Sequence, residues 1–215
     1  MRSKSRFHVV VMRNAAIIVL PFLLLFSLTV AAHAAGNPAL EGLETLRRGF
    51  AGTSDFTAEI VQEKQLSLMK RKMVSTGVVR FKKPGIFYME LYPPHASRLR
   101  LQGNVLTIRL PKEGVTDRLT LPQEESLERW FAYLARPITV LPEGVDVRAE
   151  HRGGLWTLRI SPGEKGGVQS LQLVFDGEGG IKRLAIDEKN GDRTVIRFHD
   201  FRRNVGLGEH DFQVE

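Results

Sequence analysis

The chain has 215 residues, no cysteine, 26% charged residues and a formal net charge of +7. Without cysteine it has no disulfide, no thiolate metal site and no thiol nucleophile, so its core alone must hold it together. Four of the 31 basic residues and none of the 24 acidic ones lie in the first 34 positions, which leaves a net charge of +3 for the remainder. That balance gives no indication of a nucleic-acid partner.

The first 34 residues are typical of a secretory signal peptide. Four basic residues precede an apolar stretch at 17–30, and Ala32-His33-Ala34 has the small-x-small form of a cleavage site. Residues 15–32 are nearly long enough to span a membrane, so an uncleaved anchor is the alternative. We expect cleavage and a mature protein of 181 residues, 35–215. Because it has no cysteine to acylate, we expect it to be soluble in the periplasm rather than lipid-anchored.

Residues 38–50 have the apolar periodicity of an amphipathic helix, and strand patterns follow it. We expect strands at 56–68, 73–81, 81–94, 97–101, 105–110, 117–121, 145–150, 156–160, 169–175, 181–187 and 194–201. Gly77, in the middle of a strand, indicates a bulge or a bend. The regular alternation of strand and turn predicts one antiparallel sheet of about ten or eleven strands, strongly curled or closed.

Residues 122–136 interrupt the strands with a second helical pattern, which Pro137 ends. Its large apolar residues recur at the spacing of one helix face: Leu127, Trp130, Phe131 and Leu134. Packing in the core is the plain interpretation of such a stripe. Two helices can cover the mouth of a curled sheet but cannot fill its concave face, so we predict an apolar cavity with this helix as a lid.

The stretch at 81–94 is the densest apolar and aromatic run outside the N-terminus. As a strand it places Phe87, Met89 and Leu91 on one face, opposite a mixed face. A small sheet can bury such a face in its core. If too little chain covers it, the face becomes a binding surface for an apolar ligand, which is the interpretation that we favour.

No catalytic or phosphate-binding motif is evident. The glycine-rich turn at 176–180 lies between two strands and opens no helix. His199-Asp200 and His210-Asp211 are adjacent pairs, and neighbours on a strand point to opposite faces. Glu59, Glu63 and Glu90 are best interpreted as outward charges. We therefore expect a binding protein rather than an enzyme, with no metal and no cofactor.

Several short motifs occur in an order that resembles a known family. They are Phe56-Thr57-Ala58 with Gln62, Gly77 leading to Lys83-Pro84 and Phe87, then Pro93 or Pro94, Gln102-Gly103, and Phe131 to Ala135-Arg136. Each is weak alone, but the ordered set resembles the periplasmic outer-membrane lipoprotein carrier protein family of the LolA type. The resemblance spans nearly the whole chain after the signal peptide.

The resemblance implies a mainly β (α+β) fold in one carrier domain, residues 35–215. This would be an incomplete, strongly curled antiparallel β-barrel with an N-terminal helix and a helical lid over an apolar cavity. The implied function is to take lipoproteins from an inner-membrane ABC-type release complex, shield their acyl chains, and deliver them to an outer-membrane acceptor. We expect a monomer.

Site residues carried over from the resemblance start with Phe87 at the cavity mouth and Phe131 and Leu134 in the lid. Lys83 stands where the family typically has an arginine that latches the lid, and Met89 stands at an aromatic position. These departures suggest a divergent member with a different lipid cargo. The full predicted lipid-binding set is Phe87, Met89, Leu91, Leu127, Trp130, Phe131 and Leu134.

Other functions remain open at this stage. The protein could carry a free lipid or glycolipid, or it could be a half-barrel module that senses mislocalised lipoproteins or envelope stress. The sensor would usually need a second domain. Identifying any lipid that copurifies with the protein by mass spectrometry would separate lipoprotein carriage from carriage of a free lipid.

Overall fold

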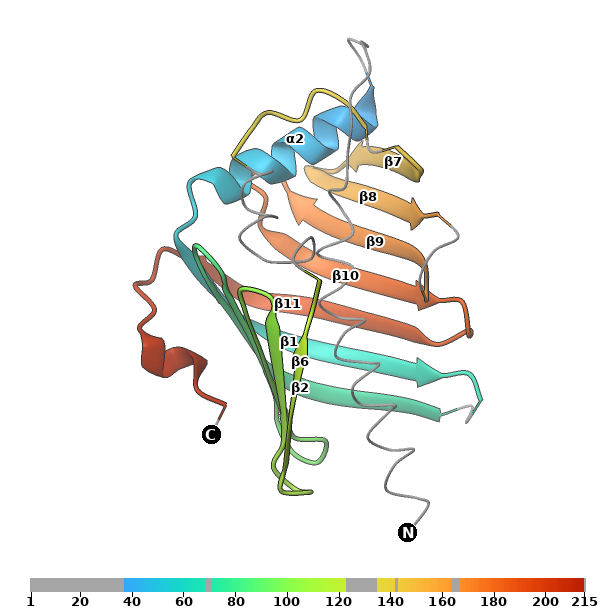
Figure 1. Ribbon diagram of the computed structural model, residues 1–215. Helices are drawn as coiled ribbons and strands as arrows, with labels where there is room; N and C mark the ends of the chain where they lie inside the picture. Colours follow the sequence, from blue (N-terminus) through green and yellow to red (C-terminus); the bar gives the residue numbers. More distant parts are fainter. Residues whose placement is uncertain (1–36, 69–70, 123–134, 142, 164–166, 215) are drawn as a thin grey trace.

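The computed structural model describes residues 37–68, 71–122, 135–141, 143–163 and 167–214. Within them, eleven antiparallel strands form a single curled sheet, and helix α2 (Pro38–Ala51) lies across one mouth of the curl (Figure 1). The strands are β1 (Asp55–Leu66), β2 (Arg71–Lys82), β3 (Ile86–Leu91), β4 (Ser97–Gln102), β5 (Val105–Leu110), β6 (Val115–Thr120), β7 (Val145–Arg152), β8 (Leu155–Pro162), β9 (Val168–Asp176), β10 (Ile181–Glu188) and β11 (Arg193–Arg203). The predicted mainly β, curled antiparallel architecture is confirmed.

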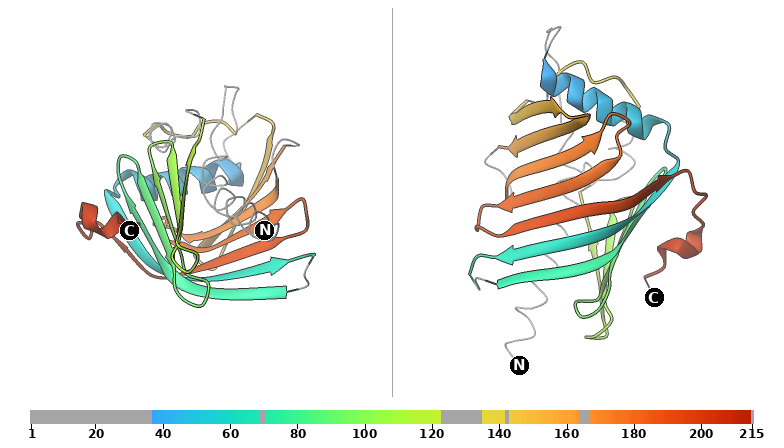
Figure 2. Two further views of the ribbon diagram at one scale, coloured as in Figure 1. Left: turned by 60° about the horizontal axis from the view of Figure 1, so that its bottom comes forward. Right: turned by 180° about the vertical axis from the view of Figure 1, so that it is seen from behind.

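The sheet is not closed into a barrel. Its order is β6-β5-β4-β3-β2-β1-β11-β10-β9-β8-β7, so β6 and β7 are edge strands that do not pair with each other. Figure 2 shows the resulting trough from two further directions. The predicted helix at 122–136 lies almost wholly outside the described residues.

Strands β1 and β2 are the longest hairpin and connect the two halves of the trough. They pair without a register shift from Asp55–Lys82 to Leu66–Arg71, so of the bulge or bend predicted at Gly77 the bulge is wrong. Strand β3 pairs only with the second half of β2, beginning where Leu91 faces Gly77. A Cβ atom at Gly77 would lie 1.9 Å from the carbonyl oxygen of Glu90. Glycine is therefore needed here for the close approach of β3, not for a bulge.

Helix α2 begins where the Asn37 side chain accepts a hydrogen bond from Ala39 N at 2.9 Å, with Pro38 in its first turn. It packs across β7 and β8 (Figure 1). A Cβ atom at Gly42 would lie 2.9 Å from Leu158 Cδ2, so the helix approaches this sheet very closely. No helix in the described ranges is both long enough and apolar enough to cross a membrane.

The C-terminal segment, for which the sequence analysis made no prediction, packs on the outer face of the sheet. After β11 the chain turns back through a short 3-10 helix, η3 (Glu209–Phe212) (Figures 1 and 2). A second apolar cluster forms there from Tyr88, Leu207, Phe212 and Val214, with Ile86 against it. The mixed face of β3 is therefore covered by the chain's own tail, whereas the Phe87 face points into the trough.

Candidate functional site

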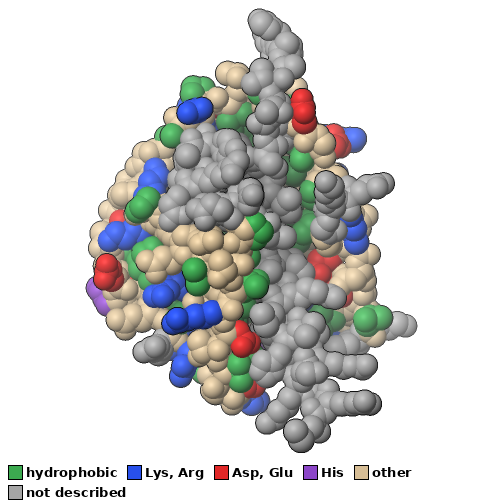
Figure 3. Space-filling view, in the orientation of Figure 1, with side chains coloured by type: hydrophobic (Ala, Val, Ile, Leu, Met, Phe, Trp, Pro, Cys, Tyr) green, Lys and Arg blue, Asp and Glu red, His purple; other side chains and the backbone are tan. Residues whose placement is uncertain are grey.

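The concave face of the sheet is lined by one continuous apolar cluster. Each of β1–β5 and β7–β11 contributes at least one buried apolar side chain, and α2 adds Leu43, Leu46 and Phe50. In the view of Figure 3, hydrophobic and charged side chains of the described residues are interspersed on the visible face. The apolar lining of the concave face is suited to contact with long apolar groups.

Strand β3 places its predicted binding residues in this cluster. Met89 and Leu91 are buried members of it, and Phe87 is partly buried against it. Their role in binding remains a prediction. The predicted lid residues Leu127, Trp130, Phe131 and Leu134 lie outside the described residues.

An aromatic end of the concave face lies beside the C-terminus of α2. The Phe56 ring is 5.9 Å from Phe50, 5.3 Å from Phe81 and 5.0 Å from Phe201, measured between centroids. The pairing of β1 with β11 shifts register between Thr57 and Glu59, opposite Asp200, whose φ is 47°. Such a shift re-aims the following side chain, and Phe201 packs against the apolar cluster.

Lys83, the predicted lid latch, lies just after β2 and binds the end of α2. Its Nζ donates to the carbonyl oxygens of Phe50 at 2.9 Å and Ala51 at 3.0 Å. A cation suits these carbonyls, because they lie at the C-terminus of the helix and carry its negative dipole end. Burial lowers the pKa of Lys83 from its ordinary value. Lys83 therefore caps α2, and a contact with the lid stays a prediction.

The described segment that follows the predicted lid is also tied to α2. The backbone N–H of Ile138 donates to Glu44 Oε2 at 2.9 Å, and Arg47 donates to the same carboxylate. These bonds hold the pKa of Glu44 below its ordinary value. Ile138 and Leu141 pack against the apolar cluster. The segment that directly follows the predicted lid in sequence therefore lies beside α2.

A polar end of the concave face lies where β1, β2, β10 and β11 reach their hairpin tips. It consists of five side chains that are each less than a tenth exposed: Gln62, Lys64, Ser75, Glu188 and Thr194. Lys64 faces Thr194 across β1 and β11, and Gln62 faces Ser75 across β1 and β2. Lys64 Nζ lies 3.8 Å from Glu188 Oε1. Charged groups are seldom this deeply buried unless they are paired or functional.

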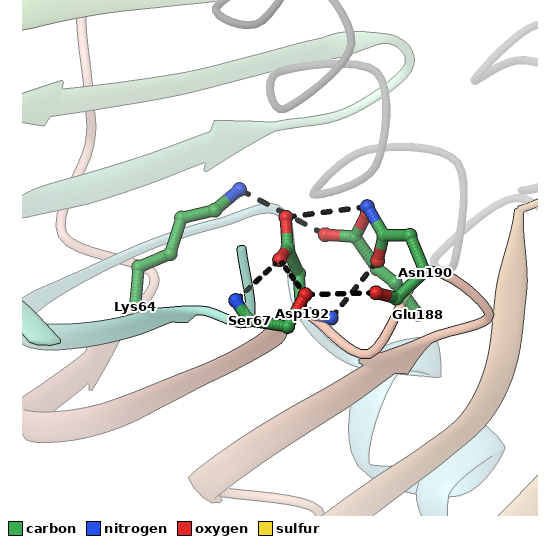
Figure 4. A network of polar contacts seen from close by, with 5 residues as sticks. All are labelled: Lys64, Ser67, Glu188, Asn190 and Asp192. Atoms are coloured by element: carbon green, nitrogen blue, oxygen red, sulfur yellow. Dashed lines mark hydrogen bonds and ion pairs between the residues drawn. The ribbon is translucent and has the colours of Figure 1, made fainter. Parts of the chain in front are cut away.

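A hydrogen-bonded turn supports this polar end. Asp192 Oδ1 accepts hydrogen bonds from Ser67 N at 2.9 Å and Ser67 Oγ at 3.1 Å, and Asn190 Nδ2 donates to Asp192 Oδ2 at 3.2 Å. Figure 4 shows Lys64 and Glu188 beside this turn. The network joins the tip of the β1–β2 hairpin to the turn between β10 and β11, so it holds the positions of Lys64 and Glu188.

Comparison with known proteins gives a family match over residues 51–215, to the model described as outer membrane lipoprotein carrier protein LolA. The chain belongs to this family. It is 23% identical over 194 residues to the outer-membrane lipoprotein carrier protein of Neisseria gonorrhoeae, covering 89% of this chain and 90% of that one.

Solved structures with a related fold include a LolA superfamily protein from Nitrosomonas europaea. The match has a TM-score of 0.42 and 11% identity, and it covers 82% of this chain and 97% of that one. Another is a putative outer membrane lipoprotein-sorting protein domain from Vibrio parahaemolyticus. That match has a TM-score of 0.44 and 13% identity, and it covers 81% of this chain and 95% of that one.

Sequence reasoning missed most of the polar end of this LolA family member. The signal was present in β1, because the inward positions Phe56, Ala58 and Ile60 continue with period two to Gln62 and Lys64. A polar residue at an inward position is normally taken to mark the end of the buried face. The structure shows that each of these two side chains is still only 8% exposed.

The outward charges of this LolA family member lie as predicted. Glu63 forms ion pairs with Lys72 and Arg197, and hydrogen bonds from these two cations lower its pKa to about 2. Glu90 pairs with Arg98 at 2.9 Å. Burial, together with the Glu90 carboxylate beside it, raises the pKa of Tyr88 to about 12. Within the described ranges, no group of three His, Cys, Asp or Glu side chains is arranged to hold a metal.

Proposed function

We propose that this protein is a periplasmic carrier that binds the acyl chains of lipoproteins on its concave face. The observation that carries the proposal is the continuous apolar lining of an unclosed sheet, in a chain that belongs to the LolA family. Phe87, Met89 and Leu91 form part of this lining and are the proposed contacts on β3. The predicted helix with Leu127, Trp130, Phe131 and Leu134 is the proposed lid.

The physical need for such a carrier comes from the cargo. Burial of one methylene group is worth about 0.8 kcal/mol, so several acyl chains hold a lipoprotein firmly in a membrane. A carrier in water must replace most of that contact with its own apolar surface. It must also bind the chains less tightly than the acceptor does, because otherwise the cargo would not be released.

The proposed route runs from the inner to the outer membrane. An ABC-type release complex in the inner membrane would load the carrier, and an acceptor at the outer membrane would unload it. The apparent signal peptide at residues 1–34 supports export. The chemistry on this route is transfer without covalent change, so we propose no catalytic residue.

A charge on the concave face tests this function. We expect Phe87→Glu to weaken binding of a triacylated peptide at least tenfold, because the carboxylate would have to be buried against acyl chains. Binding would be measured by displacement of an apolar fluorescent dye, and folding by circular dichroism. Tyr92→Glu is the matched control, because Tyr92 is exposed and follows the end of β3.

The outcome separates binding from core packing. If Phe87→Glu unfolds while Tyr92→Glu does not, Phe87 serves the core and the proposed contact is wrong. A wild-type protein that binds neither the triacylated peptide nor any copurifying lipid would overturn the proposed function itself.

A further inference from the structure

The polar end is unexpected in a face built to hold apolar chains. Burial of a polar group without a full set of hydrogen bonds lowers the stability of the fold. Two residues away on the same strands, the chain places Ile60, Ile186 and Ile196 inward. Isoleucine at the polar positions would fit a face that served folding alone. The buried polar side chains therefore require another explanation.

Gln62 provides the clearest indication of a ligand. Its side chain is only 8% exposed, and its Oε1 atom accepts no hydrogen bond from any described residue. On the neighbouring position of the same face, Lys64 Nζ lies 3.8 Å from Glu188 Oε1. Among the described residues, the polar end thus has a buried acceptor without a donor beside a buried ion pair.

The charges at the polar end limit the class of ligand. Lys64 and Glu188 carry opposite charges, and Asp192 adds a second carboxylate close by (Figure 4). An anionic phosphate would be brought next to two carboxylates and one ammonium, which is unfavourable. An uncharged amide group instead offers a carbonyl oxygen to Lys64 and an N–H to Gln62 or Glu188, and an ester group offers the carbonyl oxygen alone.

We propose that Gln62, Lys64 and Glu188 form a polar subsite that binds the uncharged amide and ester groups at which acyl chains join a carried molecule, and that this subsite discriminates against phospholipid phosphate. This subsite rests on the proposed function, because it presupposes acyl chains on the concave face. Beyond acyl-chain binding, the subsite would make the protein selective among acylated ligands. The protein would prefer acylated peptides or neutral acylglycerols to the phospholipids that surround them in a membrane.

Three ligands with identical palmitoyl chains test the selectivity of the purified protein. They are a triacylated cysteinyl peptide, dipalmitoylglycerol and dipalmitoylphosphatidylglycerol, each used to displace N-phenyl-1-naphthylamine, an apolar dye without a carbonyl group. We expect the wild type to bind phosphatidylglycerol about tenfold more weakly than the other two. Binding of the peptide but not of dipalmitoylglycerol would identify the amide-bearing cargo as the ligand. Equal binding of both would identify the ester groups.

The Gln62→Leu variant tests the residue. We expect it to bind the peptide about tenfold more weakly, to bind dipalmitoylglycerol and the dye as the wild type does, and to be at least as resistant to heat. Gln65→Leu makes the same change at an exposed position on β1 and is the matched control. Gln62→Met, which keeps the length of the side chain, replaces Gln62→Leu if that variant does not fold.

The results distinguish the subsite from the carrier function. If the wild type binds all three ligands equally and Gln62→Leu changes none of these affinities, the subsite is wrong and acyl-chain binding stands. If the wild type binds the dye but none of the three ligands, both proposals fail.

Discussion

The two ends of the concave face differ in their side chains and in the contacts that hold them in place. At the aromatic end, four phenylalanine rings pack together and the end of α2 is fixed by Lys83. At the polar end, buried polar side chains lie among isoleucines, and the support comes from a hydrogen-bonded turn at Asp192. Both ends belong to the same strands β1 and β11. The difference therefore lies in the side chains and not in the strands that carry them.

The contrast indicates that stability and recognition are separated along the trough. Aromatic packing contributes favourable burial and holds α2 across the sheet. Buried polar groups lower stability unless a ligand completes their hydrogen bonds. Substitutions at the aromatic end should therefore change the free energy of unfolding, and substitutions at the polar end should mainly change ligand preference.

The largest expected effect on stability is at Phe56. Phe56→Ala should lower the free energy of unfolding by about 3–5 kcal/mol, because it removes a buried ring that contacts three others. Urea denaturation would measure this. Leu155→Ala, at a large apolar residue that is 38% exposed, is the control and should cost much less. Unchanged stability with lost acyl binding would assign the aromatic end to recognition instead.

A smaller effect is expected at Lys83. Lys83→Met should lower the free energy of unfolding by about 1–2 kcal/mol, because the carbonyl oxygens of Phe50 and Ala51 lose the hydrogen bonds that the Lys83 ammonium donates, although Phe50 O still accepts from Thr53 N. Lys112→Met, in the exposed loop between β5 and β6, is the control. If Lys83→Met leaves stability intact but speeds release of bound acyl chains, the lysine acts as the lid latch rather than as a helix cap.

The smallest effect is expected on the outer face of β1, at Glu63. Its folded pKa of about 2 is below the ordinary 4.5, so its ion pairs stabilise the fold fully above pH 4.5 and lose this contribution as the pH falls toward 2. The stability difference between wild type and Glu63→Gln should shrink over that range, and 1 M salt should reduce it at pH 7. Acyl binding should not change, and a change would contradict the separation of the two faces.

The strands were predictable because apolar and polar residues alternate along each strand, and this pattern is visible in the sequence of that strand alone. Residues 97–101 and 105–110, for example, correspond to β4 and β5 within one residue. The covering of Tyr88 by Leu207 and Phe212 was not predictable, because it joins segments more than a hundred residues apart. The Phe87 face of β3 follows from the period of two. The burial of Gln62 and Lys64 depends on tertiary structure, which the period of two alone does not predict.

Lys83 shows the same limit at the candidate site. The residue could be singled out from its place before Pro84, but its hydrogen-bond acceptors could not be identified. They are carbonyl groups at the end of a helix more than thirty residues earlier. Side-chain partners set by tertiary contacts leave little trace in a single sequence.

The unpaired seam between β6 and β7 has a mechanical consequence. A closed barrel has a radius fixed by its number of strands and their stagger, so its interior cannot widen without breaking hydrogen bonds. This sheet has free edges, and its two halves meet at the long strands β1 and β2. A change in the twist of that hairpin moves β6 relative to β7 while every ladder stays intact. The trough can therefore change its width to match the volume of the ligand that it encloses.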